Sequence, residues 1–291
     1  MSISQSARIA SCAVVLFFLS LSAQAQIRVA VEDGSPNGTG ADIVSQLNDD
    51  TWADFSATKV TAGDIDSLAE LANYDVVIIG DSGNRNHDWT AAMSSALRDW
   101  VNAGGAAVLT GWGNYGMNTS NAIFDPLDEI FPTQNIASTN DFDNSANIMT
   151  ILDPSHPIFT GLTDFSFPGG CCTEINPLAL ETGDVELARI NSGSPDSGTA
   201  VAVKAAGSGV TVYLGPVYMG NTGYYVAGLR SGNPDRLLEQ AVVWAADGVL
   251  VGPPTAPPTP TVPVPALSQW ALIILLMLFG LAVFTNRSRL F

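Results

Sequence analysis

The runs Tyr74-Asp-Val-Val-Ile-Ile-Gly-Asp81 and Gly105-Ala-Ala-Val-Leu-Thr-Gly111 flank a segment with the pattern of a helix, Trp89–Asn102. Each run is short, almost wholly apolar and bounded by Gly or Asp, as strands buried on both faces are. Parallel sheets bury both faces of their strands because crossover helices cover them. The stretch from Tyr74 to Asn114 therefore predicts a strand-helix-strand unit in the core of an α/β sheet.

Small polar residues follow both predicted strands, in Gly80-Asp-Ser-Gly-Asn84 and in Gly111-Trp-Gly-Asn114. The carboxyl ends of parallel strands meet at one edge of a sheet, and α/β folds bind their ligands there. Asp81, Trp112 and Asn114 are therefore candidates for ligand binding.

The chain before Tyr74 alternates between strand and helix patterns. Strands are predicted at Ile27–Val31 and Ala57–Val60, and helices at Ala41–Leu47 and from an Asp64 cap to Ala72. Such alternation implies a parallel, right-handed, doubly wound sheet. We expect a flavodoxin-like α/β fold with a mostly parallel sheet.

The second half of the chain is richer in strand patterns. Val185–Ile190, Thr199–Lys204 and Val210–Gly215 are predicted strands, and a Gly-rich hairpin joins the last two. An amphipathic helix is predicted over Pro234–Ala246. Asp153-Pro-Ser-His-Pro-Ile-Phe-Thr-Gly-Leu162 is interpreted as a packed connection, because its prolines oppose regular structure.

Composition limits the possible functions. The 291-residue chain has a net charge of −17, with 46% hydrophobic and 13% charged residues. It is typical of a globular protein, and its charge would repel a phosphate backbone, so nucleic acid is not an expected partner. Residues 26–250 suffice for one domain. We predict no metal site and no cofactor.

The N-terminus has the pattern of a secretory signal peptide, residues 1–25. Arg8 precedes the apolar run Ala10–Leu21, and Ala23-Gln-Ala25 follows it. This order predicts cleavage by signal peptidase before Gln26, and the run is too short to span a membrane. The protein is therefore expected to be exported.

The C-terminus has three parts. Residues 251–265 form a Pro/Thr-rich linker, which favours an extended chain. The apolar run Ala266–Phe284 predicts a transmembrane helix, and Arg287 and Arg289 after it orient its end toward the cytoplasm. The tail 266–291 is therefore expected to hold the protein in a membrane.

Val264-Pro-Ala-Leu-Ser-Gln-Trp-Ala271, followed by the helix and the arginines, resembles the IPTL-type C-terminal sorting signal of Gram-negative bacteria. This resemblance implies an exosortase-type sorting enzyme as partner. It also implies an intermediate anchored in the inner membrane and a final location at the cell surface or outside the cell. Val264, Ala266 and Ala271 depart from the pattern, so plain anchoring stays open.

Five motifs in order, "YDVVIIGD", "WVNAGGAAVLTG", "DPSHPIFTGL", "GVTVYLGP" and "RLLEQAVVWAADG", resemble the class I glutamine-amidotransferase-like superfamily. The resemblance is strongest to its trehalose-utilisation-like branch and spans most of Ile27–Gly248.

In catalytic members of that superfamily a nucleophilic Cys follows the strand equivalent to Ala106–Thr110, and a His lies near the domain end. This chain has Gly111-Trp-Gly113 at that turn and no His after His156. We therefore expect a non-catalytic domain that binds a glycan or a protein of the envelope or matrix.

An exported hydrolase is the alternative hypothesis, and it would act either through Ser82 and His156 or through a Cys–His pair that uses Cys171 or Cys172. Ser82 in Gly80-Asp-Ser-Gly83 and the pair Asp153 and His156 resemble the motifs of GDS-type esterases, although both lie at unusual distances from the chain ends. His156 can also be a structural group or a ligand-binding residue.

Two further features leave alternatives open. Cys171 and Cys172 are adjacent and, in an exported protein, can form a strained vicinal disulfide, pair between molecules or stay as thiols. Five aromatic residues in Gly/Asn-rich loops can stack on a sugar or a peptide or cover the edge of the sheet, and they are Trp112, Tyr115, Tyr218, Tyr224 and Tyr225.

Overall fold

The computed structural model describes residues 26–33, 40–49, 51–80, 88–117, 121–132, 141–143, 147–167, 173–175, 180, 183–190, 198–218 and 227–248. All of these lie in one compact unit, Ala25–Thr255. The predicted signal peptide, the Pro/Thr linker and the C-terminal tail lie outside the described residues. Within the described ranges, no helix is both long and apolar enough to cross a bilayer.

The first half alternates between strands and helices, as predicted. Its elements are β1 (Ile27–Glu32), α1 (Gly40–Leu47), β2 (Phe55–Val60), the 3-10 turn η1 (Ala62–Asp64), α2 (Leu68–Leu71), β3 (Val76–Ile79), α3 (Ala91–Asn102), β4 (Ala106–Thr110), α4 (Gly111–Met117), η2 (Ala122–Phe124) and α5 (Asp125–Ile130).

The second half holds most of the remaining strands and ends in the longest described helix. Its elements are β5 (Asp141–Asp143), β6 (Asn147–Ile151), η3 (Pro157–Phe159), β7 (Phe165–Phe167), β8 (Thr173–Ile175), β9 (Val185–Ile190), β10 (Gly198–Ala206), β11 (Gly209–Leu214), η4 (Ala227–Arg230) and α6 (Gly232–Asp247).

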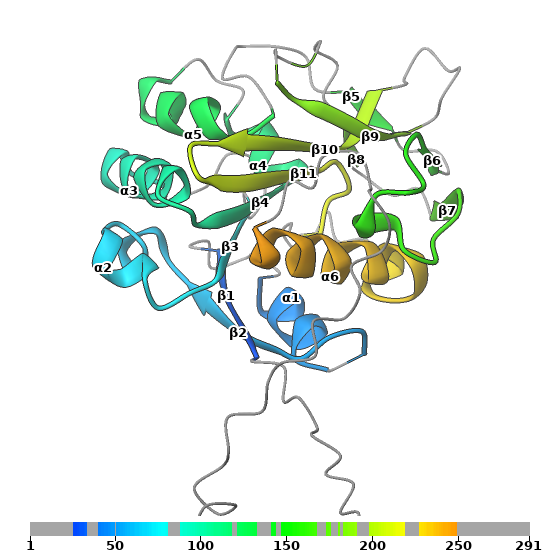
Figure 1. Cartoon of the computed structure of the whole chain (residues 1–291), viewed down its shortest axis with the longest axis horizontal. Coiled ribbons are helices and arrows are strands. Elements are labelled where there is room, and N and C mark those ends of the chain that lie inside the picture. Colours follow the sequence, from blue (N-terminus) through cyan, green and yellow to red (C-terminus); the bar gives the residue numbers. More distant parts are fainter. Residues whose placement is uncertain are drawn as a thin grey trace, which may run out of the picture. The chain divides into compact units, whose positions relative to one another are not determined.

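A nine-stranded sheet in the order β2-β1-β3-β4-β11-β10-β9-β6-β7 forms the centre of the domain (Figure 1). The pairs from β2 to β11 are parallel, whereas every pair from β11 to β7 is antiparallel. The α/β class is confirmed, but the prediction of a mostly parallel sheet is wrong for the second half. The hairpin between β10 and β11 is confirmed.

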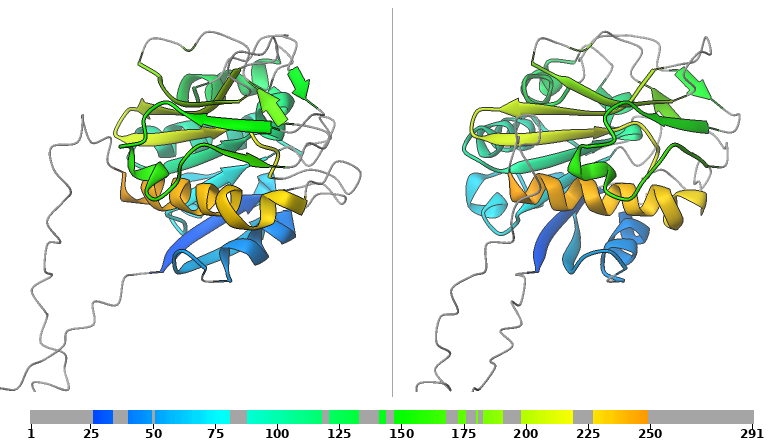
Figure 2. Two further views of the ribbon diagram at one scale, coloured as in Figure 1. Left: turned by 90° about the vertical axis from the view of Figure 1, so that its right-hand side faces the viewer. Right: turned by 45° about the vertical axis from the view of Figure 1, so that its right-hand side comes forward.

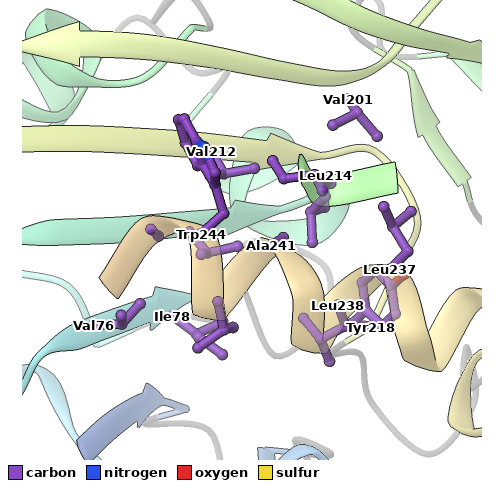
Figure 3. Close-up of a cluster of buried hydrophobic side chains, with 14 of the residues drawn as sticks. Val76, Ile78, Val201, Val212, Leu214, Tyr218, Leu237, Leu238, Ala241 and Trp244 are labelled. Atoms are coloured by element: carbon purple, nitrogen blue, oxygen red, sulfur yellow. The ribbon is translucent and has the colours of Figure 1, made fainter. Parts of the chain in front are cut away.

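Helices cover both faces of the parallel strands. Alternate residues of one strand enter different cores: Ile78 of β3 packs on the side of α1 and α6, and Ile79 on the side of α3 and α5. The first side is drawn close up in Figure 3, and α6 lies across the front in both views of Figure 2. Since both faces are covered, the all-apolar strands in the Tyr74–Asn114 stretch are explained.

Two local predictions need correction. Asp64 does not cap α2: its carboxylate accepts hydrogen bonds from the backbone N–H and the hydroxyl of Thr61, and Ser67 caps α2 instead. The turn expected after β4 at Gly111–Gly113 is the start of helix α4, although Gly111, Gly113 and Gly116 all disfavour a helix. The connection Asp153–Leu162 is packed as expected but contains the 3-10 turn η3.

Candidate functional site

The carboxyl edge of the parallel strands has a topological switch point between β1 and β3, because the strand order reverses there. Two buried carboxylates lie at the end of β1, Glu32 and Asp33. Glu32 accepts a hydrogen bond of 2.6 Å from Trp89 Nε1. Asp33 accepts one of 2.7 Å from the Gly40 backbone N–H and pairs with Lys59 at 3.3 Å. Both acids therefore tie neighbouring segments to this edge.

The turn after β4 is tight. A Cβ atom on Gly113 would lie 2.5 Å from Leu109 Cδ1 and 2.9 Å from the Ile79 carbonyl oxygen, so the space next to β3 admits only a glycine. A strand that passes directly into a helix through such a turn is the geometry in which α/β enzymes present a nucleophile. β4 passes into α4 through a turn of this kind, and Trp112 lies in it.

Trp112 occupies this turn and is 1% exposed. Its indole packs edge-on against Tyr115, with ring centroids 5.2 Å apart, and against Val217. Tyr218 is equally buried, donates its hydroxyl hydrogen to the Pro234 carbonyl oxygen at 2.7 Å, and has its pKa raised by burial. These aromatic side chains cover the sheet edge in this structure, which is the second of the two alternatives above.

Asn114, two residues later, is also 1% exposed. Neither Oδ1 nor Nδ2 of its amide has a hydrogen-bond partner. A buried amide without a partner costs about 1–3 kcal/mol. Asn114 therefore has hydrogen-bonding capacity at both amide atoms that the fold does not use.

Asp153 and His156 form local contacts. Asp153 accepts hydrogen bonds from the backbone N–H and the hydroxyl of Ser155, and the hydroxyl bond lowers the pKa of its carboxyl. His156 Nδ1 accepts a bond of 3.4 Å from the Ile158 backbone N–H, its ring lies 5.0 Å from that of Trp244, and burial lowers its pKa.

The structure does not bring His156 to the turn after β4. Tyr218, at the carboxyl edge, contacts the start of α6 at Pro234, whereas His156 packs on Trp244 near the end of that helix. Ten helical residues separate these two points, which is about 15 Å along the axis. Figure 3 shows Tyr218 and Trp244 at opposite ends of α6.

The remaining candidates cannot be placed. The candidates that lie outside the described residues are Asp81, Ser82, Cys171, Cys172, Tyr224 and Tyr225. In the described part of the chain, no group of His, Cys, Asp and Glu side chains could hold a metal ion.

Sequence reasoning missed an acidic pair on α6, Asp235 and Glu239, both nearly inaccessible to solvent. Asp235 accepts hydrogen bonds from Gln46 Nε2 at 2.5 Å and from Trp52 Nε1 at 3.3 Å. Glu239 Oε2 accepts bonds of 3.2 Å from the backbone N–H groups of Trp52 and Ala53.

Burial raises the pKa of both carboxyls, and that of Glu239 reaches about 8, with Asp235 as the next cause. The signal that could have revealed the pair is their i, i+4 spacing beside the apolar stripe of the helix.

Comparison with protein families identifies the C-terminal segment of the chain. The chain matches the IPTL-CTERM motif at residues 262–289. No significant match is found among curated protein sequences.

Several solved structures are similar to this domain. Their sequence identity to it is low, so the similarity shows a common fold and nothing further. A ThuA-like protein from Parabacteroides merdae superposes with a TM-score of 0.57 at 13% identity, covering 79% of this chain and 94% of that one. A ThuA-like protein from Bacteroides uniformis superposes with a TM-score of 0.53 at 14% identity, covering 75% of this chain and 91% of that one. A cytoplasmic protein from Salmonella typhimurium superposes with a TM-score of 0.54 at 12% identity, covering 75% of this chain and 98% of that one.

The motif implies export, sorting to the cell surface and processing by an exosortase-type enzyme. The chain thus joins an α/β domain with the fold of ThuA-like proteins of the trehalose-utilisation type to a C-terminal IPTL-CTERM sorting motif.

Proposed function

We propose that the protein is a surface-sorted, non-catalytic binding domain that holds a glycan of the cell envelope or matrix at the carboxyl edge of its parallel strands. The observation that carries the proposal is the buried Asn114 amide, whose two polar atoms have no partner. A sugar hydroxyl both donates and accepts hydrogen bonds, so it could use both atoms.

Binding is favoured over catalysis by what occupies the turn after β4. A buried tryptophan lies where catalytic members of the superfamily present a cysteine, and the hydrogen-bonded imidazole of His156 packs near the other end of α6. An esterase using Ser82 with Asp153 and His156 would need that imidazole at the carboxyl edge. Its present contacts therefore favour a structural role.

Glycan binding by the Gln26–Leu250 fragment tests the proposal, because all the described strands and both cores lie within it. We expect the fragment to retain envelope or matrix polysaccharides and Asn114→Ala to weaken the binding about tenfold, the usual effect of one lost hydrogen bond in a buried site. Asn73→Ala, at an exposed asparagine after α2, is the control. Equal binding by Asn114→Ala and the parent would contradict the proposal, and so would a parent that binds only proteins.

The sorting step has a separate test. Deleting residues 266–291 should convert a membrane- or surface-associated protein into a freely secreted one, measured by cell fractionation with an antibody against the domain. If the truncated and full-length proteins fractionate alike, the tail does not sort the protein.

A further inference from the structure

Trp52 combines exposure with a fixed position. It is 47% exposed and lies just before β2. Its indole N–H donates to Asp235 at 3.3 Å, and its backbone N–H donates to Glu239 at 3.2 Å. An exposed indole is thus held by side chains of α6, which limits the rotamer entropy that a ligand would have to overcome.

Arg236 adds a second constraint on the ring. Its guanidinium carbon lies 4.7 Å from the centroid of the Trp52 ring, within cation-π distance. The guanidinium also donates to the carbonyl oxygens of Thr160 and Gly161, at 2.6 Å and 3.2 Å. Gly161 has φ +69°, and a Cβ atom there would lie 2.4 Å from the nearest guanidinium nitrogen. The glycine therefore gives the arginine its place beside the indole.

The groups that hold Trp52 carry a free-energy cost. Glu239 is fully buried, and its Oε1 has no hydrogen-bond partner. Oε1 of the adjacent Gln240, whose Nε2 donates to Thr160, likewise has none. Unsatisfied polar groups beneath a rigid, exposed aromatic side chain oppose folding, and such local conflicts concentrate at functional sites.

The surroundings of Trp52 indicate the class of ligand. The other large, exposed apolar residues that the structure describes lie on or beside α2, β6 and β9, and they are Leu68, Ile148, Leu152 and Val185. Trp52 is therefore an isolated apolar platform among polar groups, whereas the core of a protein interface is a broader apolar patch. A pyranose ring fits this arrangement, because it has an apolar C–H face and a rim of hydroxyls. The net charge of −17 and the nearby acids favour a neutral sugar.

We propose that Trp52, with Arg236 beside it, is a stacking subsite for a neutral sugar. This subsite shares no residue with the carboxyl-edge site at Asn114, and its proposal does not depend on that site. The sugar would lie against the open part of the indole, and its hydroxyls would bond to the polar side chains around the ring.

The full-length chain, solubilised in a non-saccharide detergent and labelled with 5-fluorotryptophan, provides a direct test. Each of its six tryptophans gives a fluorine signal, and Trp52→Phe assigns that of Trp52. Cellohexaose, chitohexaose and mannohexaose are the probes, each titrated to about 10 mM, since single stacking sites bind weakly. We expect at least one probe to shift the Trp52 signal in a saturable way.

Variants of the same chain give the second readout. Trp52→Ala should weaken binding of that probe about tenfold, and Trp52→Phe should keep part of the affinity, because a phenyl ring still stacks. Leu68→Ala is the matched control, since Leu68 is 52% exposed on α2.

The inference is overturned if no probe shifts the Trp52 signal, or if Trp52→Ala binds as well as the parent. If Asn114→Ala alone weakens the binding, the Trp52 subsite fails while the carboxyl-edge proposal stands. If Trp52→Ala alone weakens the binding, the carboxyl-edge proposal fails while the Trp52 subsite stands.

Discussion

Trp112 follows one parallel strand, Trp52 precedes another, and the two side chains differ in almost every physical respect. Trp112 follows β4 and is 1% exposed, whereas Trp52 precedes β2 and is 47% exposed. Trp112 packs on Val217 and Tyr115, while Trp52 is held through hydrogen bonds to two buried acids.

The difference shows that position in a fold and availability to a ligand are separate properties. The carboxyl edge is where this class of fold binds ligands, yet there the aromatic side chain stabilises the domain. The segment before β2 is the less expected location, yet there the tryptophan is exposed and its orientation is fixed by hydrogen bonds. The two tryptophans should therefore respond in opposite ways to mutation.

The largest expected effect is on stability. Trp112→Ala should lower the free energy of unfolding by about 3–5 kcal/mol, as truncation of a buried aromatic side chain does. Trp52→Ala should lower it by only about 1–2 kcal/mol, because the ring is half in solvent and the variant loses one cation-π contact and one hydrogen bond to Asp235. Urea denaturation of the two variants measures both changes in the free energy of unfolding. A larger loss for Trp52→Ala than for Trp112→Ala would contradict the contrast between the two tryptophans.

A smaller effect tests the turn that holds Trp112. Gly113→Ala should destabilise by about 1–3 kcal/mol, because the added methyl group overlaps Leu109 and the carbonyl oxygen of Ile79. Gly63→Ala is the control, since the nearest atom there is 3.9 Å from the added Cβ. Equal thermal unfolding temperatures for the two variants would mean that α4 packs less tightly against β3 than the structure indicates.

The stability of the folded protein should depend on pH through Glu239, which holds the backbone of Trp52. The pKa of Glu239 is raised to about 8 in the folded protein, against 4.5 for an ordinary glutamate. Between these values the folded state keeps a proton that the unfolded state has lost, so stability falls as pH rises toward 8 and then levels off. Glu239→Gln lacks this loss and should be more stable than the parent above pH 8, by on the order of 1–2 kcal/mol.

Unfolding measured from pH 5 to pH 9 gives the comparison. The parent and Glu239→Gln should nearly coincide at the acidic end and separate progressively at higher pH. Parallel curves for the two proteins would show that Glu239 titrates as an ordinary carboxyl.

The smallest effect concerns Asn114. Replacing an unsatisfied amide by an apolar group of similar shape removes a desolvation penalty, so Asn114→Leu should leave the free energy of unfolding unchanged or raise it by about 1 kcal/mol. Chemical denaturation checks this. A loss of several kcal/mol would show that the amide takes part in a hydrogen-bond network of the unliganded protein.

Local sequence patterns were sufficient for the centre of the fold. The apolar runs that became β3 and β4, the helix between them and the β10–β11 hairpin were predicted because each depends on neighbouring residues. The antiparallel second half was not, because the pairing of β9 with β6 and β10 depends on contacts far apart in the chain. Helix α4 was missed because its three glycines argue against a helix that tertiary packing nevertheless forms.

The site was less predictable than the fold. Residues 111–114 were identified from the strand before them, but the burial of Trp112 and the unsatisfied amide of Asn114 depend on packing that sequence does not encode locally. Trp52 gave no sequence signal, because the acids that hold it lie more than 180 positions away.

The central claim, that the carboxyl edge binds and does not catalyse, is tested most directly by a serine-directed fluorophosphonate probe. After incubation of the exported chain with the probe, peptide mass spectrometry reports on Ser82. We predict no modification of Ser82 in the parent or in His156→Ala. Modification of Ser82 in the parent that disappears in His156→Ala would contradict the account, because it would require a working pair of nucleophile and base.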